Sequence, residues 1–235
     1  MNYITKKTSV VAIFIAILSV AVFAAATNYS LFGDAELVSP GFNSATAAQL
    51  RSNVSGTNYG GVDFNVPAEL TVGDLDVLST DLKFTAGSCA GGAPRFQISV
   101  TDGTNSGNIF AYIGPAPNYT SCPQNVWANT GNLVAPTNLV DTSQLPGGTF
   151  YDPYAAAQTR YAAYTITGIQ LVTDGSWKIE GTQTVLADNV KINNVTFTFE
   201  SANSCKNDGY LQFTSSPGPF KNQGQCVSYF AKGGQ

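Results

Sequence analysis

The chain has 235 residues, and its 11 basic and 15 acidic residues give a net charge of −4. Nucleic acid is excluded as an expected partner, because polyanion binding needs a basic field and the Lys and Arg residues are scattered singly. Histidine is absent. This excludes a Ser-His-Asp triad, a Cys-His nucleophile and a histidine-ligated zinc site.

An apolar leader opens the chain. Lys6 and Lys7 precede an apolar run over residues 10–23, and three alanines follow at 24–26. This order predicts a signal peptide over residues 1–26 whose removal leaves nine basic and 15 acidic residues, a net charge of −6. An uncleaved anchor is the alternative, because the run approaches the ~18–20 apolar residues of a membrane helix. We expect a secreted, extracellular or cell-surface protein, with membrane contact only if the leader is retained.

Four cysteines follow the leader, and no two of them form a C-x-x-C pair. In an exported chain this pattern favours disulfides over a zinc site or a redox motif. Four cysteines can form two disulfides in three different ways. Proximity in the sequence favours Cys89 with Cys122 and Cys205 with Cys226, and each bridge would stabilise the fold by roughly 2–4 kcal/mol.

Short segments rich in β-forming residues recur between Gly, Pro, Asn and Asp residues, and long stretches of helical periodicity are missing after the leader. Their spacing and turn chemistry predict an all-β fold, a jelly-roll β-sandwich with one or two short helices. The expected strands are 35–38, 61–66, 81–85, 95–101, 108–113, 163–173, 177–179, 184–192 and 195–200.

Two short helices are expected. Thr71 can cap a helix over residues 72–78, and Pro153 can begin an alanine-rich helix that runs to Arg160. The predicted sandwich occupies residues 27–200. Residues 201–235 form a Gly-, Asn-, Ser- and Pro-rich appendix, which its own cysteine pair would staple.

The segment from Thr184 to Ile192, which contains the run Asp188-Asn189-Val190, resembles the last strand of galactose-binding-like jelly rolls. Many carbohydrate-binding modules share that fold, and the resemblance extends loosely over residues 34–200. It implies a structural calcium ion that joins the first strand to the last.

The carboxylates at the matching positions are Asp34 or Glu36 together with Asp188. Calcium prefers hard oxygen ligands of this type. Alternatively, Asp188 accepts hydrogen bonds from a turn, while Asp34 and Glu36 are solvated. No other cofactor is expected.

The appendix carries a second resemblance. The run from Cys205 to Tyr210 and the run from Phe220 to Tyr229 resemble a C-terminal segment of exported bacterial proteins of unknown role. That segment usually has tryptophan at the position of Tyr210, and no activity follows from the resemblance.

Period-two alternation along residues 95–101 turns three apolar side chains towards the core and a polar row outwards. Planar amides, a guanidinium group and hydroxyls suit the vicinal hydroxyls of a sugar. The outward row is Arg95, Gln97 and Ser99, continued on the next strand by Asn108, Phe110 and Tyr112. An ordinary solvent-facing row, with Arg95 paired to an acid, is the alternative.

A proline-stiffened loop between Gly114 and Asn129 carries Tyr119 and Trp127. Their rings could stack on the C–H face of a pyranose, and a stiff loop loses little entropy on binding. Alternatively, Trp127 fills the core beneath the loop. Trp177 follows a hydrophobic segment and is expected in the core.

These observations predict a non-catalytic binding module for a glycan or cell-surface polysaccharide. A glycosidase needs two suitably separated carboxylates, but no glutamate lies mid-strand in an E-x-D or E-x-E arrangement. The expected ligand-binding residues are Arg95, Gln97, Tyr112, Tyr119 and Trp127. The alternative is a structural cell-surface or matrix protein, and a glycoside hydrolase is the third hypothesis.

Overall fold

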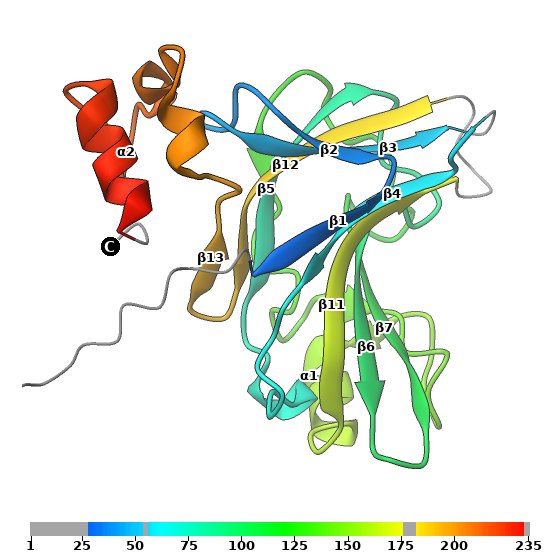
Figure 1. The fold of residues 1–235 in the computed structure, drawn as a ribbon. Helices are drawn as coiled ribbons and strands as arrows, with labels where there is room; N and C mark the ends of the chain where they lie inside the picture. Colours follow the sequence, from blue (N-terminus) through cyan, green and yellow to red (C-terminus); the bar gives the residue numbers. More distant parts are fainter. Residues whose placement is uncertain (1–27, 54–55, 176–181, 233–235) are drawn as a thin grey trace, which may run out of the picture.

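Two antiparallel sheets face each other across one main core (Figure 1) in the computed structural model, which describes residues 28–53, 56–175 and 182–232. One sheet has the order β1 (Tyr29–Gly33), β4 (Tyr59–Phe64), β11 (Thr165–Asp174), β6 (Arg95–Thr101) and β7 (Ser106–Tyr112). The other has the order β2 (Ala35–Val38), β3 (Ala47–Asn53), β12 (Thr182–Ile192), β5 (Leu78–Ala86) and β8 (Ala128–Asn129), with β13 (Val195–Phe197) also paired to β12. The predicted all-β sandwich is confirmed.

Successive strands cross between the two layers. The chain passes from one sheet to the other after β1, β3, β4, β5, β7 and β11, the last crossing leading directly to β12. The late strand β11 then lies between β4 and β6, and the late strand β12 lies between β3 and β5. This wrapping of two sheets is that of a jelly roll.

Alternation along the strands builds the core. Phe96 and Ile98 on β6 are at most 1% exposed, and Leu171 and Ile169 lie directly opposite them on β11. Burial of each such side chain contributes roughly 1.5–3 kcal/mol relative to its exposed state. Because side chains alternate along a strand, the residues between these positions face outwards.

The predicted strand boundaries agree best with the structure where apolar and polar residues alternate regularly. The ranges 35–38 and 95–101 match β2 and β6. The strands β1 and β3 were not predicted; β3 is built from Ala, Gln, Leu, Arg, Ser and Asn, which lack the β-branched and aromatic residues that mark strands. The expected strand 177–179, with Trp177, lies outside the described residues.

The predicted helix over residues 72–78 was wrong. Only a 3₁₀ turn forms at Val72–Asp74, and the chain is already in β5 at Leu78. Tertiary hydrogen bonds hold the intervening residues: Tyr154 Oη donates to the Leu75 carbonyl over 2.6 Å, and Asn193 Oδ1 accepts from the amide of residue 76 over 2.8 Å. The second predicted helix is confirmed as α1 (Tyr154–Arg160). It follows the two-residue strand β10 (Asp152–Pro153), which pairs with β9 (Leu139–Val140).

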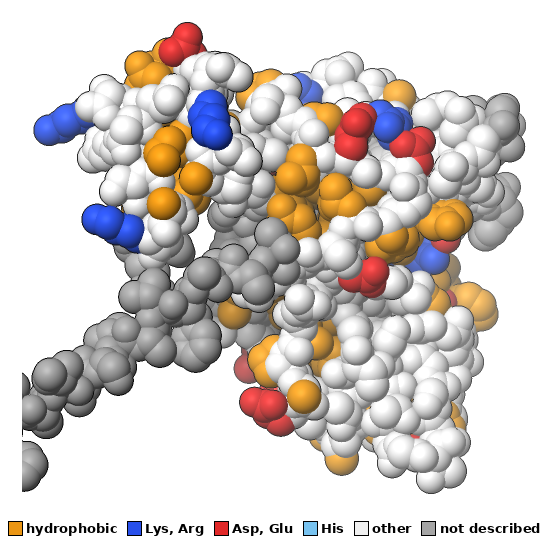
Figure 2. Space-filling view, in the orientation of Figure 1, with side chains coloured by type: hydrophobic (Ala, Val, Ile, Leu, Met, Phe, Trp, Pro, Cys, Tyr) orange, Lys and Arg blue, Asp and Glu red, His pale blue; other side chains and the backbone are white. Residues whose placement is uncertain are grey.

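The C-terminal appendix has a small core of its own. Its elements are the 3₁₀ turns Ala202–Cys205 and Gly209–Gln212 and the helix α2 (Gln223–Ala231), which was not predicted. Phe213 and Phe220 pack there against the two half-cystines and Ala45. Figure 1 places α2 to one side of the sheets, and Figure 2 shows basic and hydrophobic side chains on the surface of the appendix.

Both predicted disulfides are present. Cys89 bonds to Cys122 and Cys205 bonds to Cys226. Within the described ranges, no helix has the length and apolarity to cross a membrane. The predicted leader, residues 1–26, lies outside those ranges.

Candidate functional site

An open groove of about 410 Å³ lies on the outward face of the five-stranded sheet. Its lining comes from β1, β4, β6 and β11, which the jelly-roll order places side by side. The side chains that define it are Phe32, Asn58, Tyr59, Arg95, Gln97, Gln170, Val172 and Asp174. The groove therefore combines aromatic rings, three amides and an ion pair.

Arg95 is held in place from three sides. Its Nη2 lies 2.7 Å from Asp174 Oδ2, its Nη1 donates to the Gly92 carbonyl over 3.3 Å, and its guanidinium carbon lies 5.3 Å from the centre of the Phe110 ring. The Arg95 side chain is only 16% exposed. The acid-paired alternative thus describes Arg95 correctly, and the ion pair forms one side of the groove.

An aromatic pair forms the opposite side. The rings of Phe32 and Tyr59 have centroids 6.3 Å apart, and Tyr59 is 51% exposed. A Cβ at Gly61 would lie 2.4 Å from Phe32 Cζ, and one at Gly33, where φ is +62°, would lie 2.5 Å from Tyr59 Cδ2. The two glycines therefore allow these rings to lie close to the strands.

Amide groups lie between the two sides. Gln97 makes no side-chain hydrogen bond within the described chain, whereas Gln170 Nε2 donates to Asp63 Oδ1 over 2.5 Å. An unpaired amide has two donors and an acceptor available, and the carboxylates accept only. This set can hydrogen-bond to both the donor and the acceptor sides of sugar hydroxyls.

Tyr112 and Tyr119 flank the groove beside the ion pair. Tyr112 lies directly opposite Arg95 in the strand register, and its hydroxyl donates to Asp141 Oδ2 over 2.6 Å. Burial, followed by this hydrogen bond, raises the pKa of Tyr112. Tyr119 is 7% exposed and packs edge-on against Tyr112, with ring centroids 5.3 Å apart. Tyr119 therefore supports Tyr112 from behind and offers no open ring face.

Trp127 lies in the other layer. It immediately precedes β8 of the six-stranded sheet, and its ring centroid is 5.5 Å from that of Phe42. The structure does not bring Trp127 to the groove. Of the predicted ligand-binding residues, Arg95 and Gln97 line the groove and Tyr112 borders it.

Among the lining residues, Phe32, Tyr59 and Asp174 were not predicted as ligand-binding residues. Phe32 lies on β1, which was not predicted, and the other two lie at the ends of β4 and β11. Their residue types were visible in the sequence. Their neighbourhood depends on which strands pair, and no local pattern encodes that.

The predicted calcium ligands have other partners. Asp34 and Glu36 both pair with Arg51, at 2.7 and 2.6 Å, and Figure 2 shows acidic and basic side chains side by side in the region of β2 and β3. Arg51 lies opposite Thr184 in the register, four residues or roughly 13 Å along β12 from Asp188. The described residues contain no group of three or more His, Cys, Asp or Glu suited to a metal. Calcium binding stays a prediction.

A second cleft, of about 510 Å³, separates the sandwich from the appendix. Glu200 lines it, and the Glu200 Oε1 atom accepts from the Thr46 amide over 2.7 Å. Its Oε2 is buried and has no hydrogen-bond partner among the residues described. Burial raises the pKa of Glu200.

Asp188 lies behind this cleft and is 0% exposed. The pKa of Asp188 is raised to about 7: burial raises it most, hydrogen bonds from Phe42, Ser44 and Asn189 lower it in part, and the charge of Glu200 raises it. A carboxylate without solvent access cannot reach a substrate. Asp188 and Glu200 therefore do not form an acid–base pair open to the cleft.

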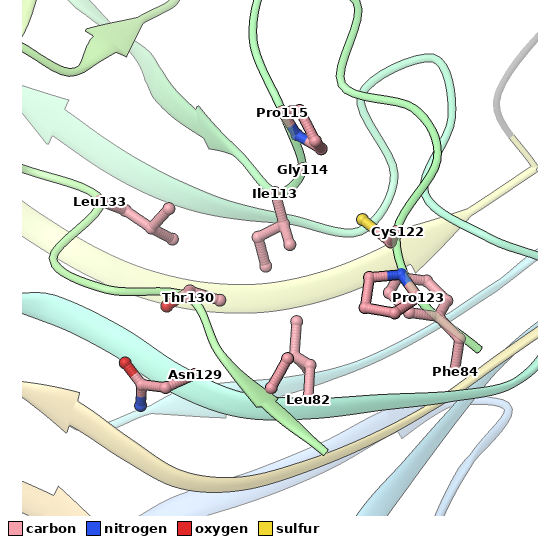
Figure 3. A pocket seen from close by; sticks show the side chains of 11 residues that line it. Leu82, Phe84, Ile113, Gly114, Pro115, Cys122, Pro123, Asn129, Thr130 and Leu133 are labelled. Carbon is pink, nitrogen blue, oxygen red and sulfur yellow. The ribbon is translucent and has the colours of Figure 1, made fainter. Parts of the chain in front are cut away.

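A third cavity, of about 210 Å³, lies beneath the proline-stiffened loop. Figure 3 shows Leu82 and Ile113 pointing towards each other across it, with Cys122 and Pro123 to one side. Its polar neighbours are engaged elsewhere, since Asn129 Nδ2 donates to Asp81 and Thr130 Oγ1 donates to the Gly131 carbonyl. This cavity is apolar and presents no chemistry for sugar hydroxyls.

No family model and no curated protein matches the chain. A solved structure described as "Structural analysis of an exo-beta-agarase" matches with a TM-score of 0.40 and 12% sequence identity, over 74% of this chain and 24% of that one. This chain thus spans about a quarter of the matched chain. A likeness this weak assigns neither a family nor an activity.

Proposed function

We propose that this protein is exported and binds carbohydrate, without cleaving it, through the groove on the five-stranded sheet. One observation carries the proposal: an aromatic pair, the exposed Tyr59 and the partly buried Phe32, shares a groove with an unpaired amide, Gln97. The C–H face of a sugar ring packs on the aromatic rings. Its hydroxyls then meet Gln97, Gln170 and the Arg95–Asp174 pair.

The groove is preorganised for this task. Its side chains stand on paired strands, and β11 is bonded on both sides, by β4 and β6. Arg95 is already immobilised by its ion pair and by Phe110. Arg95 therefore has little side-chain entropy to lose when a ligand binds, and this favours affinity.

The spacing of its acids supports binding rather than hydrolysis. Asp63 lies opposite Gln170, and Asp174 lies four residues further along β11, which separates their backbone positions by roughly 13 Å. Glycosidases place their two carboxyl groups at roughly 5–9.5 Å. In addition, Asp174 is occupied by Arg95. These two observations support binding over hydrolysis in the proposal.

Export is supported by the cysteines and the leader together. All four cysteines are paired, and disulfides persist in oxidising compartments outside the cytosol. The apolar leader at residues 1–26 provides the route. We place the protein outside the cell or at its surface, where polysaccharides are the abundant polymer.

Retention by glycans tests this function. A glycan array followed by affinity electrophoresis identifies the polysaccharide that retains the mature protein. Tyr59→Ala and Gln97→Ala should each weaken retention at least about fivefold, because an aromatic or hydrogen-bonding contact is worth ~1 kcal/mol or more. The matched control is Leu211→Ala, which removes a side chain that is 59% exposed on the appendix. Its retention should equal that of the wild type.

Two outcomes would contradict the proposal. Unchanged retention of both groove variants would remove the groove from the site. Failure of every glycan, together with concentration-dependent assembly in sedimentation, would favour the structural alternative.

A further inference from the structure

The charges around the groove are unbalanced. Arg95 is the basic side chain in the described lining, and Asp174 neutralises it. Asp63, which accepts a hydrogen bond from the lining residue Gln170, adds a further negative charge next to the groove. The adjoining segment 176–181, which lies outside the described residues, contributes one lysine and one glutamate by sequence and hence no net charge.

The charge of Arg95 is already matched by Asp174. One terminal nitrogen of Arg95 contacts Asp174, the other donates to the Gly92 carbonyl, and the guanidinium carbon lies 5.3 Å from the centre of the Phe110 ring. A carboxylate or sulfate that bound to the remaining N–H donors of Arg95 would lie close to the Asp174 carboxylate, which is a repulsive arrangement.

The field of the whole sandwich has the same sign. Residues 27–200 contain 14 acidic and six basic residues, a net charge of −8, whereas the appendix from residue 201 carries three lysines and one aspartate. A field of this sign slows the approach of a polyanion and leaves an uncharged chain unaffected. The charges around the groove and the net charge of the sandwich therefore both favour an uncharged ligand.

We propose that the groove selects uncharged glycan chains and discriminates against polyanionic ones. This inference rests on the carbohydrate-binding function proposed above and names its ligand class. The neutral chain keeps the Arg95–Asp174 pair intact and uses its hydroxyls on Gln97 and Gln170.

A matched pair of polymers tests it. The neutral polysaccharide that retains the protein is compared with its own carboxymethylated derivative, by affinity electrophoresis at low and at physiological ionic strength. We expect at least tenfold weaker retention by the carboxymethylated polymer at low ionic strength. The difference in retention between the two polymers should become smaller as salt screens the repulsion.

Two variants connect the selectivity to the groove. Asp174→Asn frees Arg95, and Asp63→Asn removes the second carboxylate; each should raise retention by the carboxymethylated polymer at least threefold relative to the wild type. Both amides are close in shape to the acids they replace, and the circular dichroism spectrum verifies folding. The control Glu69→Gln makes the same charge change at an exposed residue outside the groove and should leave the preference unchanged.

The outcomes separate the two hypotheses. Equal or stronger retention by the carboxymethylated polymer in the wild type overturns the charge selectivity and leaves carbohydrate binding intact. A Glu69→Gln effect as large as that of Asp174→Asn overturns the role of the groove charges. Absence of retention by every neutral and charged glycan overturns the proposed function and this inference together.

Discussion

Ser44 and Asp188, which are 144 residues apart in the sequence, are joined by a 2.8 Å hydrogen bond from Ser44 Oγ to Asp188 Oδ2. The amide of Phe42 donates to the same oxygen over 2.8 Å. These bonds tie the loop between β2 and β3 to β12, next to the appendix. Glu200 lies close enough that its charge raises the pKa of Asp188.

Stability should therefore fall as the pH rises through this region. Asp188 has a pKa of about 7 in the folded protein and about 3.8 in the unfolded chain. Between these values the folded state binds a proton that the unfolded state has released, so the free energy of unfolding decreases with rising pH. The loss between pH 5 and pH 8 should be on the order of 2 kcal/mol.

Urea unfolding at both pH values measures this loss, with Asp188→Asn as the comparison. The amide can still accept the bonds from Phe42 and Ser44 but cannot ionise. The variant should lose most of the difference between the two pH values. An Asp188→Asn protein with the full pH dependence of the wild type would contradict the assignment to Asp188.

Gln183→Leu should cost about 2–4 kcal/mol. Gln183 is 0% exposed, and its Nε2 donates to the carbonyls of Ser88 and Ala93 over 2.7 and 3.2 Å. The Thr173 hydroxyl donates to its Oε1. Leucine would remove the partner of the buried Thr173 hydroxyl and of the Ser88 carbonyl. Chemical denaturation measures the change, and Gln212→Leu on the exposed appendix should change stability by less than about 0.5 kcal/mol.

Replacement of Cys205 and Cys226 by serine should unfold the appendix alone. This bridge closes a 21-residue separation and contributes roughly 3 kcal/mol, while the appendix core is too small to compensate. Trypsin should then cut at Lys221 and Lys232 much faster than in the wild type. The sandwich, whose core is a separate cluster, should remain resistant. Rapid cleavage of both parts would show that the appendix supports the sandwich.

Trp127→Ala should leave glycan retention unchanged, in contrast to Tyr59→Ala. Trp127 packs on Phe42 beside the six-stranded sheet, away from the groove. Its loss should appear instead as reduced stability, by about 1–3 kcal/mol. Thermal unfolding and affinity electrophoresis on the same sample distinguish the two effects. Weaker retention by folded Trp127→Ala protein would place a second sugar contact on that layer.

Features with a local cause could be predicted from the sequence. The alternation at Phe96, Ile98 and Val100 defines which side of β6 faces the core, because successive side chains point in opposite directions. Each disulfide joins two cysteines with no other cysteine between them, at separations of 33 and 21 residues. The start of α1 after Pro153 follows from the backbone preference of proline.

Features that depend on residues far away in the sequence could not be predicted from the sequence. Residues 75–77 do not continue the turn as a helix, because Tyr154 and Asn193 bind their backbone, and both lie more than 75 residues away. β3 is a strand because β2 and β12 flank it, although its composition favours no strand. In both cases tertiary hydrogen bonds outweigh local preference, which amounts to less than about 1 kcal/mol per residue.

The same distinction between local and tertiary causes applies to the candidate site. The sequence alone established that Arg95 and Gln97 face outwards on one strand, since alternation needs no partner. The meeting of these two residues with Phe32, Tyr59 and Asp174 was decided by the order of strands in the folded sheet. The same order moved Trp127 to the opposite layer. Alternation specifies a face of a strand, whereas the lateral neighbours of that strand depend on how the whole chain minimises its exposed apolar surface.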